Sequence, residues 1–189
     1  MDYSNLDNLY ELFELQSKNY NKKKFLHSIN ADKSLNTFSW KDVSEKTILI
    51  SNFLRNQGVV KGDRVMLVSE GRPEWMISDL SILRTGAVTV PNYTTYTQKD
   101  FEFVLSDCRP KGLIVSNYKL YKIIIDASKK INFNFEFILS FDEINNIIDF
   151  KKIDIKEDKV VNNCTRLDPA CIIYTSGTQG NPKGVILSH

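Results

Sequence analysis

Short apolar runs alternate along the chain with longer segments in which apolar residues recur at helical spacing. The run Val65-Met66-Leu67-Val68 follows the turn sequence Lys61-Gly62-Asp63, and comparable runs recur before residue 140. The pattern predicts strands at residues 64–69, 87–90, 111–116 and 135–139, and helices at residues 43–57, 73–84, 98–106 and 118–130. Strands that alternate with helices favour an α/β fold with a mostly parallel sheet and helical crossovers.

Glycine, proline and threonine mark the expected ends of these segments. Gly58 takes the position of a helix C-cap, and Gly86 is expected to end the helix that begins at Pro73. Pro91 is expected to stop the second strand, and Thr97 can cap the helix that follows it.

The start of the chain predicts an amphipathic helix, because four apolar residues fall on one helical face: Leu6, Leu9, Tyr10 and Phe13. Ser4 and Asp7 have the spacing of a capping box. We interpret this face as core packing rather than membrane contact, since its flanks are acidic and not basic.

Residues 141–161 break the alternation, because they are rich in Asn, Asp and Lys with Ile at intervals. We expect a short helix and then a surface excursion. No internal repeat is present, and no aromatic residues interleave with the lysine pairs as a nucleic-acid platform would require.

Composition places the chain among ordinary globular proteins, with 42% apolar and 25% charged residues. A net charge of +2 predicts no strong attraction to nucleic acid or to an anionic membrane. The N-terminal residues lack the basic head and apolar run of a secretory signal, and no stretch reaches the ~18 apolar residues of a transmembrane helix. We expect a cytoplasmic location, with peripheral membrane contact left open, and the sequence does not determine the oligomeric state.

Cys108, Cys164 and Cys171 are scattered and form no CxxC pair, and His27 lies far from His189. A zinc site needs clustered ligands, so no metal site is predicted. We expect buried free thiols in a reducing compartment rather than a disulfide framework.

The end of the chain combines the residue types that bind phosphate. An apolar strand from Cys171 to Tyr174 runs into a loop rich in glycine and hydroxyl residues, and a second apolar strand begins at Val185. Glycines let backbone N–H groups approach a polyphosphate, hydroxyls donate hydrogen bonds to its oxygens, and Lys183 adds a positive charge. The hydroxyl residues in question are Thr175, Ser176 and Thr178.

This loop is not a Walker A motif, which reads GxxxxGK[ST] and opens a helix. Here Pro182 precedes the lysine, Gly184 follows it, and a strand comes next. An anion would therefore be held by loop amides and side chains without a helix dipole. The plain alternative is a glycine- and serine-rich hairpin loop with no ligand.

Residues 174–185, Tyr-Thr-Ser-Gly-Thr-Gln-Gly-Asn-Pro-Lys-Gly-Val, resemble the signature of the adenylate-forming superfamily. That superfamily includes acyl-CoA synthetases, luciferases and nonribosomal peptide adenylation domains. The usual string has threonine where this chain has Gln179, a bulkier side chain that can still donate a hydrogen bond. The resemblance covers roughly residues 25–189, and it is weakest in the Asn- and Lys-rich middle. Its further matching strings are Phe38–Val43, Gly58–Val65, Arg72–Trp75, Gly86–Pro91 and Asp168–Ala170, of which the third and fourth look like the long-chain fatty acyl-CoA synthetase branch.

The resemblance implies a two-step reaction. A carboxylate attacks the α-phosphate of Mg-ATP to give acyl-AMP and pyrophosphate, and a thiol, usually coenzyme A, then takes the acyl group. Lys183 would stabilise the charge that develops on pyrophosphate, which makes it the catalytic candidate. By the same resemblance, the ATP-binding residues are Thr175, Ser176, Gly177, Thr178, Gln179, Gly180 and Lys183.

The resemblance also implies that residues 1–189 are the first part of a large N-terminal AMP-binding domain. The adenine- and ribose-binding segments, the Mg²⁺-binding Glu, the acyl pocket and the main catalytic Lys of this family come later in its sequences. We therefore expect Mg²⁺ and coenzyme A to bind mainly elsewhere, and the chain alone to be inactive. We also expect both strands that flank the loop to leave open edges, with poor stability as a result.

Two alternatives remain beside a fatty acyl-CoA synthetase. One is an amino-acid or aryl-acid adenylation domain, and the other is a nucleotide-binding module without catalysis. Arg72, Trp75 and Asp168 are interpreted as structural residues, and His189 is kept as a weaker candidate for the acyl or nucleotide site.

Overall fold

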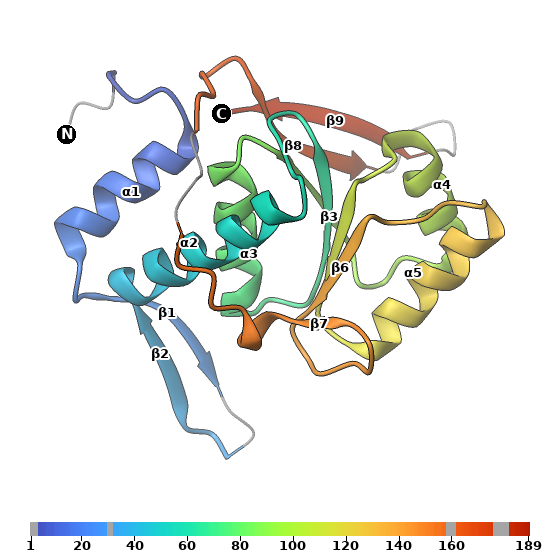
Figure 1. Cartoon of the computed structure of the whole chain (residues 1–189), viewed down its shortest axis with the longest axis horizontal. Coiled ribbons are helices and arrows are strands. Elements are labelled where there is room, and N and C mark those ends of the chain that lie inside the picture. Colours follow the sequence, from blue (N-terminus) through green and yellow to red (C-terminus); the bar gives the residue numbers. More distant parts are fainter. Residues whose placement is uncertain (1–3, 30–31, 158–161, 176–181) are drawn as a thin grey trace.

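The computed structural model describes residues 4–29, 32–157, 162–175 and 182–189. Within these residues the strands form one seven-stranded sheet, in the order β7-β6-β5-β3-β4-β8-β9, and a separate hairpin β1-β2 (Figure 1). Neighbouring strands of the large sheet are parallel except β8 and β9. The expected α/β fold with a mostly parallel sheet is confirmed. The elements are α1 (Leu9–Tyr20), β1 (Lys24–Ile29), β2 (Leu35–Ser39), α2 (Trp40–Asn56), β3 (Arg64–Val68), α3 (Pro73–Arg84), β4 (Val88–Asn92), α4 (Gln98–Cys108), β5 (Gly112–Val115), α5 (Tyr118–Lys130), β6 (Phe137–Ser140), β7 (Ile148–Asp149), a 3-10 turn (Phe150–Lys152), β8 (Pro169–Thr175) and β9 (Lys183–Ser188).

Two helical layers cover the two faces of the sheet. In β3, Val65 and Leu67 pack toward α1, α2 and α3, whereas Met66 and Val68 pack toward α4 and α5. A strand buried on both faces reads as a continuous apolar run, because successive side chains point to opposite sides. Figure 1 shows α2 and α3 on one side of the sheet and α4 and α5 on the other.

Helix caps follow the sequence in most places. Ser39 and Thr97 form capping boxes with residues three positions later, and Gly58 and Gly86 follow helices with φ of +77°. Space at Gly86 is also tight, since a Cβ there would lie 3.1 Å from the Cys164 sulfur.

The first helix begins later than its pattern predicts. Asn8, not Ser4, caps α1, because its side chain accepts a hydrogen bond from the Glu11 N–H at 3.0 Å. Tyr10 and Phe13 are buried in the core as expected, but Leu9 is 43% exposed and the helix excludes Leu6. The predicted capping box and half of the predicted face are therefore wrong.

Strand β4 does not stop at Pro91. Its parallel ladder with β3 continues through Leu67↔Pro91 and Val68↔Asn92, while its register with β8 is at Thr89↔Cys171. Strands β3, β5, β6 and β8 differ from expectation by one or two residues at their ends, whereas the two-residue strand β7 is not predicted.

Hairpin β1-β2 is not predicted by the apolar pattern. Its strands are antiparallel and mix polar with apolar residues, and none of these residues is fully buried, so they show no clean alternation of buried and exposed positions. The hairpin is held at its base, where the ring of Phe25 stacks on Trp40 with centroids 3.7 Å apart.

The segment after β6 runs largely along the surface, as its composition predicts, but isolated apolar residues anchor it to the core. Phe141 and Phe150 are buried and meet edge to face at 5.1 Å. Asn52 donates a side-chain hydrogen bond to the Ile155 carbonyl at 2.8 Å, and a 3-10 turn replaces the expected short helix. Residues 158–161 lie outside the described part.

Strand β9 forms one edge of the large sheet as the structure describes it. Val185, Ile186 and Leu187 in β9 are 44%, 63% and 44% exposed, and β9 ends the strand order. The expectation of open edges is therefore correct for β9 and wrong for β8, which pairs with β4 as well as β9.

Candidate nucleotide phosphate site

The candidate site lies at the turn end of the β8-β9 hairpin. The antiparallel register places Thr175 opposite Lys183 and Tyr174 opposite Gly184. Residues directly opposite each other in such a pair have Cβ atoms ~5 Å apart, so residues far apart along the hairpin become neighbours. The second strand begins at Lys183, earlier than the predicted start at Val185, because the ladder extends to this pair.

The two described site residues are available to a ligand. Thr175 and Lys183 are both exposed. Within the described residues, Lys183 forms neither an ion pair nor a side-chain hydrogen bond. A hydroxyl donor and an ammonium group thus flank the turn, an arrangement suited to an anion with several oxygens. The other candidates, Ser176, Gly177, Thr178, Gln179 and Gly180, lie outside the described residues.

The strand that leads into the turn is anchored by Tyr174, which opens the signature string but is not among the predicted binding residues. Tyr174 is 2% exposed, and its hydroxyl donates a hydrogen bond to Asp107 Oδ2 at 2.5 Å. Its carbonyl oxygen accepts a hydrogen bond from the Tyr96 hydroxyl at 3.2 Å. Both partners lie far upstream, at separations of 67 and 78 positions, so no local pattern indicates these contacts.

Asp168 has a structural role at the start of β8. Its carboxylate accepts hydrogen bonds from the Thr165 N–H at 2.7 Å and from the Lys61 ammonium at 2.9 Å. These hydrogen bonds hold the pKa of Asp168 at about 2. A carboxylate with that pKa is a poor general base near neutral pH, so the structural interpretation of Asp168 is supported.

His189 lies at the opposite end of the hairpin from Thr175 and Lys183. The register pairs Pro169 with Ser188 there, and His189 Nδ1 accepts a hydrogen bond from the Leu9 N–H at 3.3 Å. Burial lowers the pKa of the imidazole. The weaker candidacy of His189 for the nucleotide site finds no support in this placement.

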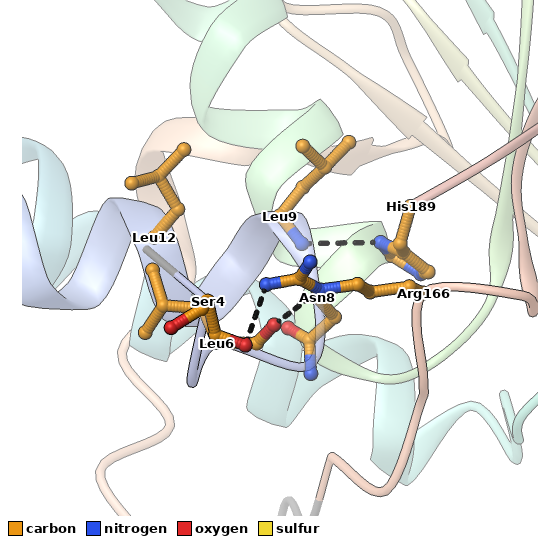
Figure 2. Close-up of a pocket in the computed structure, with 7 residues that line it drawn as sticks. All are labelled: Ser4, Leu6, Asn8, Leu9, Leu12, Arg166 and His189. Atoms are coloured by element: carbon orange, nitrogen blue, oxygen red, sulfur yellow. Dashed lines mark hydrogen bonds between the residues drawn. The ribbon is translucent and has the colours of Figure 1, made fainter. Parts of the chain in front are cut away.

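His189 lines a cavity of about 450 Å³ (Figure 2). Arg166 reaches across it and donates hydrogen bonds to the Leu6 carbonyl at 2.8 Å and the Ser4 carbonyl at 3.0 Å. These bonds tie the start of the chain to the segment before β8. The cavity is separated from the phosphate candidates by the length of the hairpin, and its lining residues are Ser4, Leu6, Asn8, Leu9, Leu12, Arg166 and His189.

Arg72 is also a structural residue, as expected. Its guanidinium contacts Asp142 at 2.9 Å and Glu74 at 3.4 Å, and it lies 5.5 Å from the centroid of the Phe141 ring. Trp75 packs against the core beneath α1, α2 and α3.

Neither a metal cluster nor a membrane span occurs in the part of the chain that the structure describes. No group of three or more His, Cys, Asp or Glu side chains there could hold a metal ion. Over the same residues, no helix combines the length and the apolar character that crossing a bilayer requires. The three cysteines are free thiols, with Cys108 and Cys164 buried and Cys171 half-buried.

Solved structures with the same fold belong to acid-activating and luciferase-like enzymes. A luciferase-like enzyme of the mealworm Zophobas morio superposes with a TM-score of 0.87 over 100% of this chain and 44% of its own, at 19% identity. The anthranilate CoA ligase AuaEII, solved with anthranoyl-AMP, gives a TM-score of 0.83 over 100% of this chain and 36% of its own, at 25% identity.

Curated relatives come from several branches. The human mitochondrial acyl-coenzyme A synthetase ACSM5 is 29% identical over 78% of this chain and 26% of its own length. Long chain acyl-CoA synthetase 3 of Arabidopsis thaliana is 28% identical over 80% and 25%. A plipastatin synthase polypeptide of Bacillus subtilis is 31% identical over 99% of this chain and 6% of its own. This chain thus spans a small part of each relative. The family model for AMP-binding enzymes matches residues 13–189, and the chain belongs to the AMP-binding enzyme family.

Proposed function

We propose that this chain carries the ATP phosphate-binding part of an AMP-forming acyl-activating enzyme. The observation that carries the proposal is the pairing of Thr175 with Lys183 at the turn end of the hairpin. In the proposed reaction, a carboxylic acid attacks the α-phosphate of Mg-ATP to form acyl-AMP and pyrophosphate. The coenzyme A thiol then attacks the acyl carbonyl of acyl-AMP, which forms the thioester and releases AMP.

The role of Lys183 follows from its charge and exposure. As the bond to the α-phosphate breaks, negative charge builds on the leaving pyrophosphate, and an ammonium group near it stabilises the transition state more than the ground state. Thr175 contributes a hydrogen-bond donor beside it. We propose that Mg²⁺ and coenzyme A are bound mainly by other parts of the parent enzyme, since the chain spans about a quarter of the acyl-CoA synthetases that it resembles.

A fatty acid, and a long-chain one in particular, is the proposed substrate. It is supported by the strings at residues 72–75 and 86–91 and by the similarity to the Arabidopsis long chain acyl-CoA synthetase. Similarity to the plipastatin synthase and to the anthranilate CoA ligase favours an amino-acid or aryl-acid substrate as the second candidate. ATP–pyrophosphate exchange with each acid class, on protein expressed from any coding sequence that continues past residue 189, distinguishes them.

Titration of the purified chain with Mg-ATP tests the nucleotide site directly. We expect Lys183→Ala to weaken binding at least tenfold, roughly the ~1.4 kcal/mol of one charge-assisted contact. Lys129→Ala is the matched control, because Lys129 is exposed in the last turn of α5. A wild-type chain that does not bind Mg-ATP, or a Lys183 variant that binds equally well, would contradict the proposal.

A further inference from the structure

The hairpin that carries Thr175 and Lys183 has few supports of its own. Every residue of β9 is exposed, so the position of this strand depends on its pairing with β8. Strand β8 in turn is fixed near its end by Tyr174, whose hydroxyl contacts Asp107 and whose carbonyl contacts the Tyr96 hydroxyl. Asp107 belongs to α4 and Tyr96 to the turn just before it. A single helix and its leading turn therefore hold both the main chain and the side chain of one residue.

The Tyr174 ring also links the two strands. Gly184 lies opposite it, and a Cβ on Gly184 would be 3.2 Å from Tyr174 Cζ and 3.1 Å from Ile172 Cγ2. The glycine thus leaves room for the ring to lie across β9. On its other side the ring meets Phe103 of α4 edge to face, with centroids 6.3 Å apart. The order of packing is helix α4, then the Tyr174 ring, then the backbone of β9.

The hydroxyl of Tyr174 is a dependable donor in this position. Burial, reinforced by the hydrogen bond to Asp107, raises the pKa of Tyr174 above its ordinary value. The hydroxyl therefore stays protonated at physiological pH and donates a hydrogen bond to a carboxylate oxygen. Such a hydrogen bond is stronger than one between two neutral groups.

We propose that Tyr174 is a positioning residue for the phosphate site, and that α4 sets the direction of Thr175 and Lys183 through it. Tyr174 and Gly184 are the cross-strand pair next to Thr175 and Lys183, so a shift of one pair moves the other. Contacts to a transferring phosphate tolerate small displacements poorly, and residues that lock the supporting strand set their precision. This inference rests on the proposed function, because the proposed function assigns the phosphate site to the β8-β9 hairpin.

Two conservative variants and their combination test the inference. Tyr174→Phe removes only the hydroxyl, and Asp107→Asn keeps the shape of the acceptor but not its charge. We expect Tyr174→Phe, which removes the hydrogen bond, to weaken Mg-ATP binding roughly tenfold, and Asp107→Asn, which keeps a neutral acceptor, to weaken it less. The double variant should bind no more weakly than Tyr174→Phe alone, because both substitutions act on the same hydrogen bond. Tyr118→Phe is the matched control, since Tyr118 is 61% exposed. Additive losses, or a Tyr174→Phe variant with wild-type affinity, would overturn the inference.

Amide hydrogen exchange without nucleotide separates this inference from the proposed function. Tyr174→Phe is expected to speed exchange at Ile172 and Ile186 of the hairpin while leaving Ile124 of α5 unchanged. If the wild type does not bind Mg-ATP, the proposed function fails, and exchange alone decides whether Tyr174 holds the hairpin. Unchanged exchange at the hairpin, or faster exchange throughout the chain, would show that Tyr174 has no specific positioning role.

Discussion

The phenyl ring of Phe137 occupies the space where a side chain at residue 112 would lie. A Cβ on Gly112 would fall 2.0 Å from Phe137 Cζ, and Phe137 is itself buried against Phe53 at a centroid distance of 5.9 Å. Gly112 and Phe137 are direct neighbours in the parallel register of β5 and β6. Glycine at this position is therefore required by packing and not by backbone conformation.

Gly112→Ala is expected to destabilise the chain by about 1–3 kcal/mol, because the ring must move within a closely packed core. Urea unfolding followed by circular dichroism measures the change. Gly71→Ala is the control, since no atom lies within 4 Å of a Cβ built there. Equal unfolding midpoints for the two variants would show that the core around Phe137 can adjust.

Residue chemistry alone predicts part of the candidate phosphate site. Thr175 and Lys183 can be selected because a hydroxyl and a lysine in a glycine-rich turn indicate anion binding, and the register brings them together. The anchoring role of Tyr174 cannot be predicted in this way, because its hydrogen-bond partners at positions 96 and 107 come close to it only when α4 packs against β8. Burial of a tyrosine hydroxyl against a distant carboxylate has no sequence signature.

At the scale of elements, the parallel sheet and its crossover helices are predictable and the first hairpin is not. Val65-Met66-Leu67-Val68 can be recognised as a strand because apolar contacts on both faces demand a continuous run. Strands β1 and β2 have no fully buried residue and so give no strand pattern in the sequence, although the ring of Phe25 stacks on Trp40. The polar composition of the segment that contains Phe150 predicts its exposed residues, but it does not reveal the isolated apolar residues that anchor the segment to the core.

Strand β9 presents an apolar edge, and we expect the purified chain to self-associate through it. Ile186→Lys places a charge at a position that is 63% exposed and should reduce self-association without lowering the melting temperature. Light scattering during a thermal ramp reports self-association, and circular dichroism over the same ramp reports the melting temperature. Lys119, already exposed on α5, offers a control in the form of Lys119→Arg. Undiminished scattering by Ile186→Lys would mean that another surface drives association.

At the scale of the whole molecule, nucleotide binding and complete catalysis are separate expectations. The chain spans 26% of the human and 25% of the Arabidopsis relative, and we propose that groups needed for acyl transfer to AMP lie outside it. The purified chain should therefore bind Mg-ATP but form no acyl-AMP from a fatty acid. Thin-layer chromatography with α-³²P-labelled ATP checks this, with the nucleotide alone as the blank. Labelled acyl-AMP above the blank would place the full catalytic set within these residues.

The hydrogen bonds between the start of the chain and the segment before β8 join residues that are translated at very different times. The Asn8 side chain donates to the Cys164 carbonyl, a partner 156 positions later, and Arg166 holds the carbonyls of Ser4 and Leu6. At ~5–20 residues per second, a ribosome needs on the order of 10–30 s to make the intervening polypeptide. The first helix thus emerges long before its last anchor exists. Until residues 164–166 are translated, the apolar face of this helix can pack only against α2 and α3.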